Sequence, residues 1–424
     1  MEAKILPFCH SFLSFLKLFF SPLSLIKKEK KVKKSVYSSL ILFISFFITL
    51  VLSGKQEAKF NSKIEEKNRV KIVKNPEESR YGEIEFDLER DLVIGSDDDE
   101  RYTLLRVWDI KADDRGNIYV LDSGAYRIQK YDREGKYVQT IGRQGQGPGE
   151  FERPINLHFD KNRNLYVAEM RKIHMFDPEG EFLKTITIPF FYMDFAADGT
   201  GNFFVTGHVR ADSAQNLGVL LINSQGEIVK KIAEFPGVPR HRTGVTLSHE
   251  YSPSLRFSAL GDVGIIYGYN PEYKLYCTNW SGKNVLIIEK DEPYRSISRG
   301  EKNKIIDDAF RNAASAESEW PRNVVEKMAN LPKHRPFFDR ILVDEKGRLY
   351  VRKLKSVLDE SRDEDFDIFG SNGNFLYSTK LPFTPLDIKY GCLYQTNYSE
   401  KTGEVQVVRW KIRNWKHIKE GIQK

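Results

Sequence analysis

The chain has 424 residues, 40% of them hydrophobic and 12% aromatic, so it can bury a large core and does not have the composition of a disordered chain. Its formal net charge of +7 is concentrated in residues 1–54, which carry +6, and the remainder of the chain carries +1. A folded part this close to neutral lacks the general attraction that drives binding to nucleic-acid backbones, so nucleic acid is not an expected partner.

The first element in the chain is an apolar segment that follows a block of lysines. Lys27 to Lys34 read KKEKKVKK, and the 17 residues from Val36 to Leu52 carry no charge. This length is sufficient to span a bilayer, and the lysines predict that the N-terminus stays in the cytoplasm. We therefore interpret residues 1–35 as a basic cytoplasmic segment and residues 36–54 as a single-pass signal anchor.

The same segment allows a second interpretation as a signal peptide, cleaved or uncleaved. Val51 and Ser53 would suit a signal peptidase, and Lys55 stands where a lipoprotein would need its lipid-bearing cysteine. Under both interpretations the rest of the chain lies outside the cytoplasm, in the periplasm or the extracellular space. Residues 55–80 are predicted to form a linker, and residues 81–424 a single folded domain.

A repeated pattern of turns and short strands predicts the fold of this domain. One motif is a polar turn followed by an apolar strand, as in ADDRGNIYV from Ala112 and VDEKGRLYV from Val343. A second motif places Asp or Asn with Gly in a tight hairpin between two strands. The glycines of this second turn are Gly135, Gly180, Gly226, Gly282 and Gly373, at spacings of 45, 46, 56 and 91 residues. A period near 45 with four short strands is typical of a β-propeller blade.

The widest spacing predicts a helical insertion before the fifth blade, over residues 295–332. Ser298 and Glu301 have the spacing of a capping box, and apolar residues follow at helical intervals. A second helix is expected to begin near Pro321. The insertion is interpreted as packing on the propeller rather than as a partner-binding element.

The two ends of the domain predict how the ring closes. Only three strands are recognisable after residue 385, and the segment from Gly82 to Gly95 belongs to no complete blade. If that segment lies beside Val405 to Ile412, it supplies the missing strand and leaves no free sheet edge. The predicted fold is therefore an all-β propeller of six blades, in which an N-terminal strand closes the last blade.

A glycine-rich stretch, GRQGQGPGEF from Gly142 to Phe151, raises the possibility of a phosphate-binding loop. It is followed by Pro154 and another strand, so there is no helix N-terminus to hold a phosphate. It also lacks the Gly-Lys-Ser/Thr ending of such loops. We interpret it as the crossing from the outer strand of the first blade to the inner strand of the second.

The turn pattern D-x-x-G-x-[IL]-Y-V and the crossing G-x-x-G-x-G-P-G-E-F resemble the NHL-repeat type of six-bladed propeller, and more closely a group of exported bacterial six-bladed propeller proteins. The resemblance extends over residues 81–412. It implies a fold and an exported location, and it does not imply one activity.

Candidate binding residues lie on the loops that join one blade to the next, where propellers commonly bind ligands. These loops are rich in basic and aromatic side chains, which suit an anionic or carbohydrate partner. We predict a non-catalytic binding or scaffold protein for a protein, peptide or carbohydrate ligand, with no catalytic residue, metal or cofactor. The candidate ligand-binding residues are Arg143, Arg153, His158, Tyr192, Arg240, His241 and Arg242.

The alternative is a metal-dependent lyase or hydrolase with its site at the mouth of the propeller channel. Some NHL-type propellers are lyases in which histidines from several blades bind a metal. His158, His208, His241 and His249 come from different blades, yet no two occupy the same place in the repeat. The sequence also lacks a Gly-x-Ser-x-Gly nucleophile motif.

Overall fold

The computed structural model describes residues 62–96, 98–211, 214–238, 247–314, 321–399 and 403–419. These residues belong to one compact unit that begins at Phe60. The predicted cytoplasmic segment and signal anchor, residues 1–54, lie outside the described ranges. Within the described ranges, no helix is both long and apolar enough to cross a membrane.

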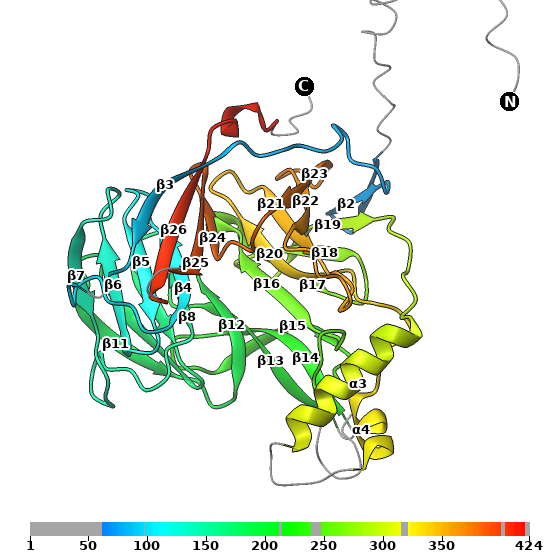
Figure 1. Ribbon diagram of the computed structural model, residues 1–424, viewed down its shortest axis with the longest axis horizontal. Coiled ribbons are helices and arrows are strands. Elements are labelled where there is room, and N and C mark those ends of the chain that lie inside the picture. Colours follow the sequence, from blue (N-terminus) through cyan, green and yellow to red (C-terminus); the bar gives the residue numbers. More distant parts are fainter. Residues whose placement is uncertain are drawn as a thin grey trace, which may run out of the picture. The chain divides into compact units, whose positions relative to one another are not determined.

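The domain is an all-β propeller of six sheets, which we number as blades one to six in the order in which the chain enters them (Figure 1). Blade one contains β4 (Val107–Ala112), β5 (Ile118–Asp122), β6 (Arg127–Tyr131) and β7 (Tyr137–Ile141). Blade two contains β8 (Asn156–Phe159), β9 (Leu165–Ala168), β10 (Lys172–Phe176) and β11 (Phe182–Thr187). Blade three contains β12 (Tyr192–Ala197), β13 (Phe203–Ala211), β14 (Ala214–Ile222) and β15 (Ile228–Phe235).

The other three blades follow the same order of antiparallel strands. Blade four contains β16 (Leu255–Ala259), β17 (Gly264–Tyr269), β18 (Lys274–Asn279) and β19 (Asn284–Lys290), with a short 3-10 helix at Gly261–Val263. Blade five contains β20 (Phe338–Val343), β21 (Leu349–Lys353), β22 (Glu364–Phe369) and β23 (Phe375–Leu381). Blade six contains β24 (Asp387–Lys389), β25 (Cys392–Tyr398) and β26 (Val405–Ile412), with a 3-10 helix at Trp415–His417 after it.

The ring closes as the sequence predicts, with three strands from the C-terminal end and one from the N-terminal end. The fourth strand of blade six is β3 (Leu88–Ile94), which pairs antiparallel with β26. An exposed contact reinforces this pairing, because Arg409 forms an ion pair with Asp91 on β3. The same guanidinium donates a hydrogen bond to the carbonyl oxygen of Arg133 in blade one.

The segment interpreted as a linker, residues 55–80, contains a β-hairpin in its described part. Its strands are β1 (Lys63–Lys67) and β2 (Val70–Asn75), and β2 pairs in parallel with β19. Blade four is therefore a sheet of six strands. Asn75 is buried and connects this hairpin to blade five, because its side chain donates to the carbonyl oxygen of Gly373 and accepts from the amide of Phe375.

The repeated turns are held by carboxylate or amide side chains that accept hydrogen bonds from the backbone of the turn. Asp160 Oδ1 accepts from the amides of Asn162 and Asn164 at 2.8 and 2.9 Å, while its Oδ2 accepts from the hydroxyl of Tyr166. Asp344 has the equivalent backbone contacts and accepts from Tyr350. This geometry is the physical reason why Asp or Asn recurs at the start of many of these turns, and why Tyr follows the first turn in blades one, two and five.

The helical insertion is present and docks through a buried carboxylate. It consists of α3 (Arg299–Ala314) and α4 (Arg322–Ala329). The predicted capping box forms, since Glu301 accepts from the amide of Ser298 at 2.8 Å and donates its own amide to Ser298 Oγ. Glu301 also accepts hydrogen bonds from Tyr251, Arg335 and Ser356.

The glycine-rich crossing wraps around one buried aromatic side chain. Phe151 is fully buried, and it lies edge to face with Phe176 of blade two. Gly142 has a φ of +76°, and a Cβ atom on it would lie 2.1 Å from the ring of Phe151. The crossing therefore needs glycine for its path and its packing, as the sequence analysis proposes.

Candidate functional site

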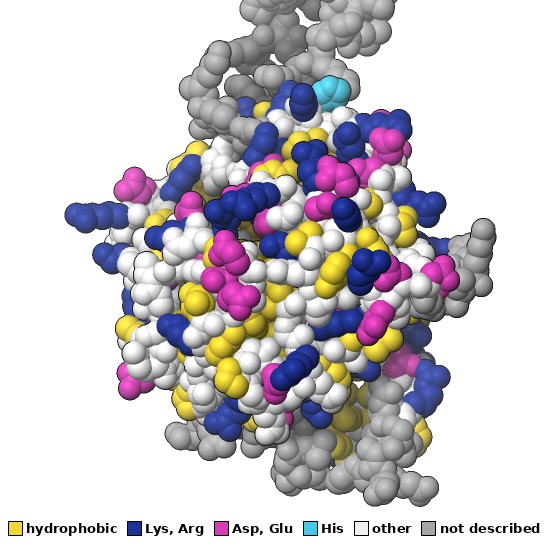
Figure 2. Space-filling view, turned by 90° about the vertical axis from the view of Figure 1, so that its left-hand side faces the viewer, with side chains coloured by type: hydrophobic (Ala, Val, Ile, Leu, Met, Phe, Trp, Pro, Cys, Tyr) yellow, Lys and Arg dark blue, Asp and Glu magenta, His cyan; other side chains and the backbone are white. Residues whose placement is uncertain are grey.

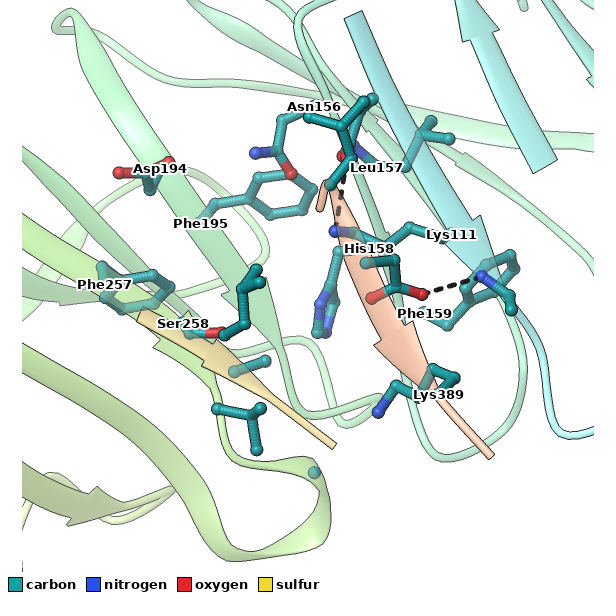
Figure 3. Close-up of a pocket in the computed structure, with 18 of the residues that line it drawn as sticks. Lys111, Asn156, Leu157, His158, Phe159, Asp194, Phe195, Phe257, Ser258 and Lys389 are labelled. Carbon is teal, nitrogen blue, oxygen red and sulfur yellow. Dashed lines mark hydrogen bonds and ion pairs between the residues drawn. The ribbon is translucent and has the colours of Figure 1, made fainter. Parts of the chain in front are cut away.

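A cavity of about 700 Å³ lies at the centre of the ring (Figure 3). Its walls come from the first strands of all six blades: β4, β8, β12, β16, β20 and β24. The lining continues to the turns at the ends of these strands, where it includes Asp113, Asp114, Arg163, Glu345 and Tyr390. The cavity is thus polar and accessible from the end that carries these turns.

One layer of the cavity wall consists of residues at the same place in the repeat, four positions before the start of the first turn. The layer is Asp109, Asn156, Asp194, Arg256, Arg340 and Leu386, one from each blade in order. Two carboxylates therefore lie on the wall formed by blades one to three, and two guanidinium groups on the wall formed by blades four and five.

Some carboxylates of the wall are used to join neighbouring blades. Asp109 Oδ2 accepts from the amide of Leu157 in blade two at 2.9 Å, and Asp387 Oδ2 accepts from the amide of Ala112 in blade one at 3.0 Å. Lys111 Nζ lies 3.3 Å from Asp109 Oδ1. Burial opposes the charge on Lys111, but the nearby carboxylates of Asp109 and Asp387 outweigh it and raise the pKa of this lysine.

Asp194 differs from these carboxylates because its side chain forms no hydrogen bond or ion pair with any residue that the structure describes. Its backbone amide donates to Thr206 Oγ1, and the residue lines the cavity next to Phe195 (Figure 3). Burial raises the pKa of Asp194 to about 6, although the positive charge of Arg256 acts in the opposite direction. This carboxylate therefore changes its charge near neutral pH.

The two guanidinium groups of the layer also have few partners. Arg256 Nε is buried and lacks a hydrogen-bond partner among the described residues. Arg340 donates one long hydrogen bond of 3.3 Å, to the carbonyl oxygen of Pro385. Burial lowers the pKa of both groups. The neighbouring Arg352, by contrast, has a complete ion pair with Asp339.

His158 lies in the cavity in its neutral form. Its Nε2 is 3.1 Å from the carbonyl oxygen of Ala197, so Nε2 carries the proton and donates it. Its ring also packs edge to face against Phe195. Burial lowers the pKa of His158 to about 4, and the positive charge of Lys111 acts in the same direction. The Nδ1 lone pair is then the part of this ring that can accept a hydrogen bond.

Of the other predicted binding residues, none that the structure describes lines the cavity. Arg143 is exposed and pairs with Glu150 inside the crossing loop. The backbone amide of Arg153 donates to Glu169, and Tyr192 is buried with its hydroxyl donating to the carbonyl oxygen of Lys172. Arg240, His241 and Arg242 lie outside the described residues. A binding role for these six residues therefore stays a prediction.

The charged layer is absent from the sequence-based candidates, although a signal for it exists. In three of the six blades the residue at this place follows a β-bulge, at Trp108, Met193 and Asp339. A bulge inserts one residue and shifts the inward and outward alternation. Aligning the repeats on their first turn, instead of following alternation along each strand, would have brought these polar residues into one column.

A metal centre has no support from the described residues. No group of three His, Cys, Asp or Glu side chains among them is placed to hold a metal ion. His158 and His249 each bind a backbone carbonyl oxygen instead, the second at Ala329. His241 lies outside the described residues.

The outer surface mixes charges of both signs. In the view of Figure 2, basic and acidic side chains alternate with hydrophobic ones, and no large area has a single sign of charge. This mixture agrees with the near-neutral net charge of the folded part. The cavity, with its ordered layer of charged side chains, is therefore a better candidate for a binding site than this face of the surface.

One family model matches part of the chain. A family model described as "Domain of unknown function (DUF4934)" matches residues 102–276, which is less than half of the chain and covers blades one to three with part of blade four. No curated protein matches. The matches name no NHL repeat, so that resemblance stays a prediction.

Solved structures with a similar chain path include several from Bacteroides. One is a Bacteroides fragilis protein assigned as exported, with 12% identity, a TM-score of 0.49 and coverage of 81% of this chain and 99% of that chain. Another is a member of the DUF4221 family from Bacteroides vulgatus, with 12% identity, a TM-score of 0.48 and coverage of 77% and 98%. Likeness at this level does not extend to function.

Proposed function

We propose that this protein is a binding propeller without catalytic activity, and that its ligand enters the central cavity. The observation that carries the proposal is the cavity itself, about 700 Å³ in volume and lined by side chains from all six blades. A volume in this range is typical of pockets that hold small molecules or single side chains of a larger partner.

The chemistry of the wall favours recognition over reaction. Lys111, Asp109 and Asp387 are held by contacts with each other or with neighbouring blades. His158 already donates its Nε2 proton to a backbone carbonyl oxygen, so this nitrogen is not free to accept a proton as a general base. Fixed polar groups around an enclosed space orient a bound ligand, which is the task of a binding site.

A steric block of the cavity tests this proposal. Ser258→Trp in β16 should place a bulky ring in the cavity and weaken binding of a ligand found in a defined set of short peptides, oligosaccharides and small carboxylic acids. Binding would be measured by calorimetry on the full chain, and circular dichroism would confirm that the variant folds. Ser281→Trp, in an exposed turn of blade four, is the control and should bind normally. A Ser258→Trp variant that binds as tightly as the wild type would refute the central cavity as the site.

We propose in addition that the propeller lies outside the cytoplasm, on a membrane anchor formed by residues 36–54. The support is the charge-free run after the lysine block, which has the length and orientation signal of a signal anchor. Protease added to intact cells with a permeabilised outer envelope should degrade the propeller. Protection equal to that of a cytoplasmic marker would contradict export, and release of the propeller without membranes would show that the anchor is cleaved.

A further inference from the structure

We infer that the cavity recognises an oxyanion, a carboxylate or a phosphate, and that Arg256 and Arg340 together hold it. This inference rests on the proposed function and names the chemical class of its ligand. The two residues occupy the same place in the repeat on β16 and β20, the first strands of adjacent blades, and both line the cavity.

The first argument is that both guanidinium groups have unused donors. A guanidinium has five N–H donors, and leaving them unpaired in a partly buried place is costly. The side chain of Arg256 forms no hydrogen bond or ion pair with the described residues, although Asp339 and Asp194 lie close enough to act on its charge, and the side chain of Arg340 makes one long hydrogen bond to a carbonyl oxygen. An oxyanion between them would satisfy several of these donors at once.

The second argument is a contrast within the same wall. Arg352 lies close enough to Arg340 for its charge to lower the pKa of that residue, yet Arg352 is fully engaged by Asp339 and by Glu364 at 3.8 Å. Among the described residues, one arginine of the wall is therefore held in ion pairs, whereas Arg256 and Arg340 have carboxylates nearby but form no ion pair with them.

The third argument concerns Asp194, which lines the same cavity. Four charged groups act on it: Asp109 and Lys111 from β4, Arg256 from β16 and Arg340 from β20. In its protonated form Asp194 can donate a hydrogen bond to an oxyanion, and in its ionised form it repels one. Oxyanion binding should therefore strengthen as the pH falls toward 5.5.

The experiment uses sodium formate and inorganic phosphate as probes with the full chain at low ionic strength. Formate keeps its charge between pH 5.5 and pH 8, so any change in its affinity reports on the protein. Calorimetry should show saturable binding of at least one probe. Arg256→Met and Arg340→Met should each weaken it at least tenfold. Preference for formate would identify a carboxylate ligand, and preference for phosphate would identify a phosphorylated one.

Further variants test whether the loss of binding comes from the guanidinium groups themselves or from a general change of charge. Arg133→Met removes one positive charge from an exposed turn of blade one, outside the cavity lining, and should change affinity less than twofold. Arg256→Lys keeps the charge and should still weaken binding severalfold, because an ammonium group cannot form the paired hydrogen bonds. Asp194→Asn should bind formate more tightly than the wild type at pH 8. The formate affinity of this variant should be the same at pH 8 and at pH 5.5.

Three outcomes would overturn the inference. The first is that neither probe binds at high concentration, the second that both arginine variants bind as tightly as the wild type, and the third that Arg133→Met weakens binding as much as they do. An uncharged ligand that Ser258→Trp excludes but the arginine variants accept would refute the oxyanion and leave the proposed function intact. A ligand that none of these variants affects would refute both.

Discussion

At the scale of single residues, His158 connects the site to the stability of the fold. Its pKa falls to about 4 in the folded protein, mainly because it is buried, against 6.5 for a free side chain. The unfolded chain therefore binds more protons than the folded chain between these two values. The contribution of neutral His158 to the free energy of unfolding is fully present above pH 6.5 and is lost as the pH falls toward 4.

Replacing His158 by Gln should reduce this loss, because Gln does not titrate and its amide can still donate to Ala197. The difference in unfolding free energy between pH 7.5 and pH 4.5 should shrink by about 2 to 3 kcal/mol in His158→Gln. Denaturant titration at the two pH values measures it. His417→Gln, at an exposed site, should leave the difference unchanged, and equal behaviour of the two variants would contradict burial as the cause.

Residue identities also show what a sequence can and cannot predict about the site. The position of His158 in the channel could be predicted, because it follows from its place in the first strand of a recognised blade. Asp194 and Arg256 belong together only in space, since they are separated by more than one blade of sequence. Their shared place in the repeat is hidden by bulges, which displace the alternation from which strand faces are usually assigned.

At the scale of structural elements, the glycine-rich crossing makes a prediction through a matched pair of glycines. Gly142 and Gly82 have nearly the same φ, +76° and +77°, but a Cβ atom would strike Phe151 at Gly142 and meet no heavy atom within 4 Å at Gly82. Gly142→Ala should therefore cost about 3 kcal/mol or more, and Gly82→Ala about 1 kcal/mol from backbone strain alone. Thermal unfolding of both variants measures the difference, and equal losses would show that packing against Phe151 is unimportant.

The docking of the helical insertion depends on Glu301. Burial alone would raise the pKa of this carboxylate, but hydrogen bonds from Tyr251 and Ser298 outweigh it and hold the pKa at about 2. Glu301→Gln removes the charge that these donors and Arg335 share, and should weaken docking by about 2 kcal/mol. Hydrogen exchange should then rise in α3 and α4 with little change in the blades. Glu326→Gln, exposed on α4, is the matched control, and faster exchange in both variants would argue against this role.

The elements themselves were predictable to different degrees. The capping box from Ser298 to Glu301 and the Asp–Gly turns have local causes, so a short stretch of sequence suffices to recognise them. The hairpin of β1 and β2 has no such local cause. The sequence of β1, KIEEK, is largely charged, and all five of its residues are exposed. What holds that hairpin is the pairing of β2 with β19 and the buried contacts of Asn75 in blade five, which are separated from it by hundreds of residues.

At the scale of the whole molecule, two shortened chains test what closes the ring. A chain that begins at residue 79 lacks the hairpin of β1 and β2 but keeps β3, and should retain six complete blades. A chain that begins at residue 96 lacks β3 as well and leaves blade six with three strands and an open edge. Only the second should unfold at a markedly lower temperature and associate through that edge. Scanning calorimetry and sedimentation would decide, and equal stability of the two chains would refute closure by β3.

The number of blades could be predicted from the sequence, because the turn glycines recur along the chain and each one marks a blade. Most of the candidate binding residues were expected on the loops between blades, whereas the lining of the central cavity follows the first strands to the turns at their other end. Loop composition indicates exposure, but the size and polarity of a channel depend on six side chains converging from separate repeats. That convergence is a geometric result of the ring.

The pairing of β3 with β26 also sets an order of events in folding. A ribosome makes β3 early, and the strand must wait while more than three hundred residues are synthesised before its partner exists. Until then β3 has no strand with which to form hydrogen bonds. The pairing of β3 with β26 joins residues more than three hundred positions apart in the sequence, and such a long separation slows folding. The ring of this protein therefore stays incomplete until β26 has been made, and a chain truncated before β26 would present two unmatched strand edges to its surroundings.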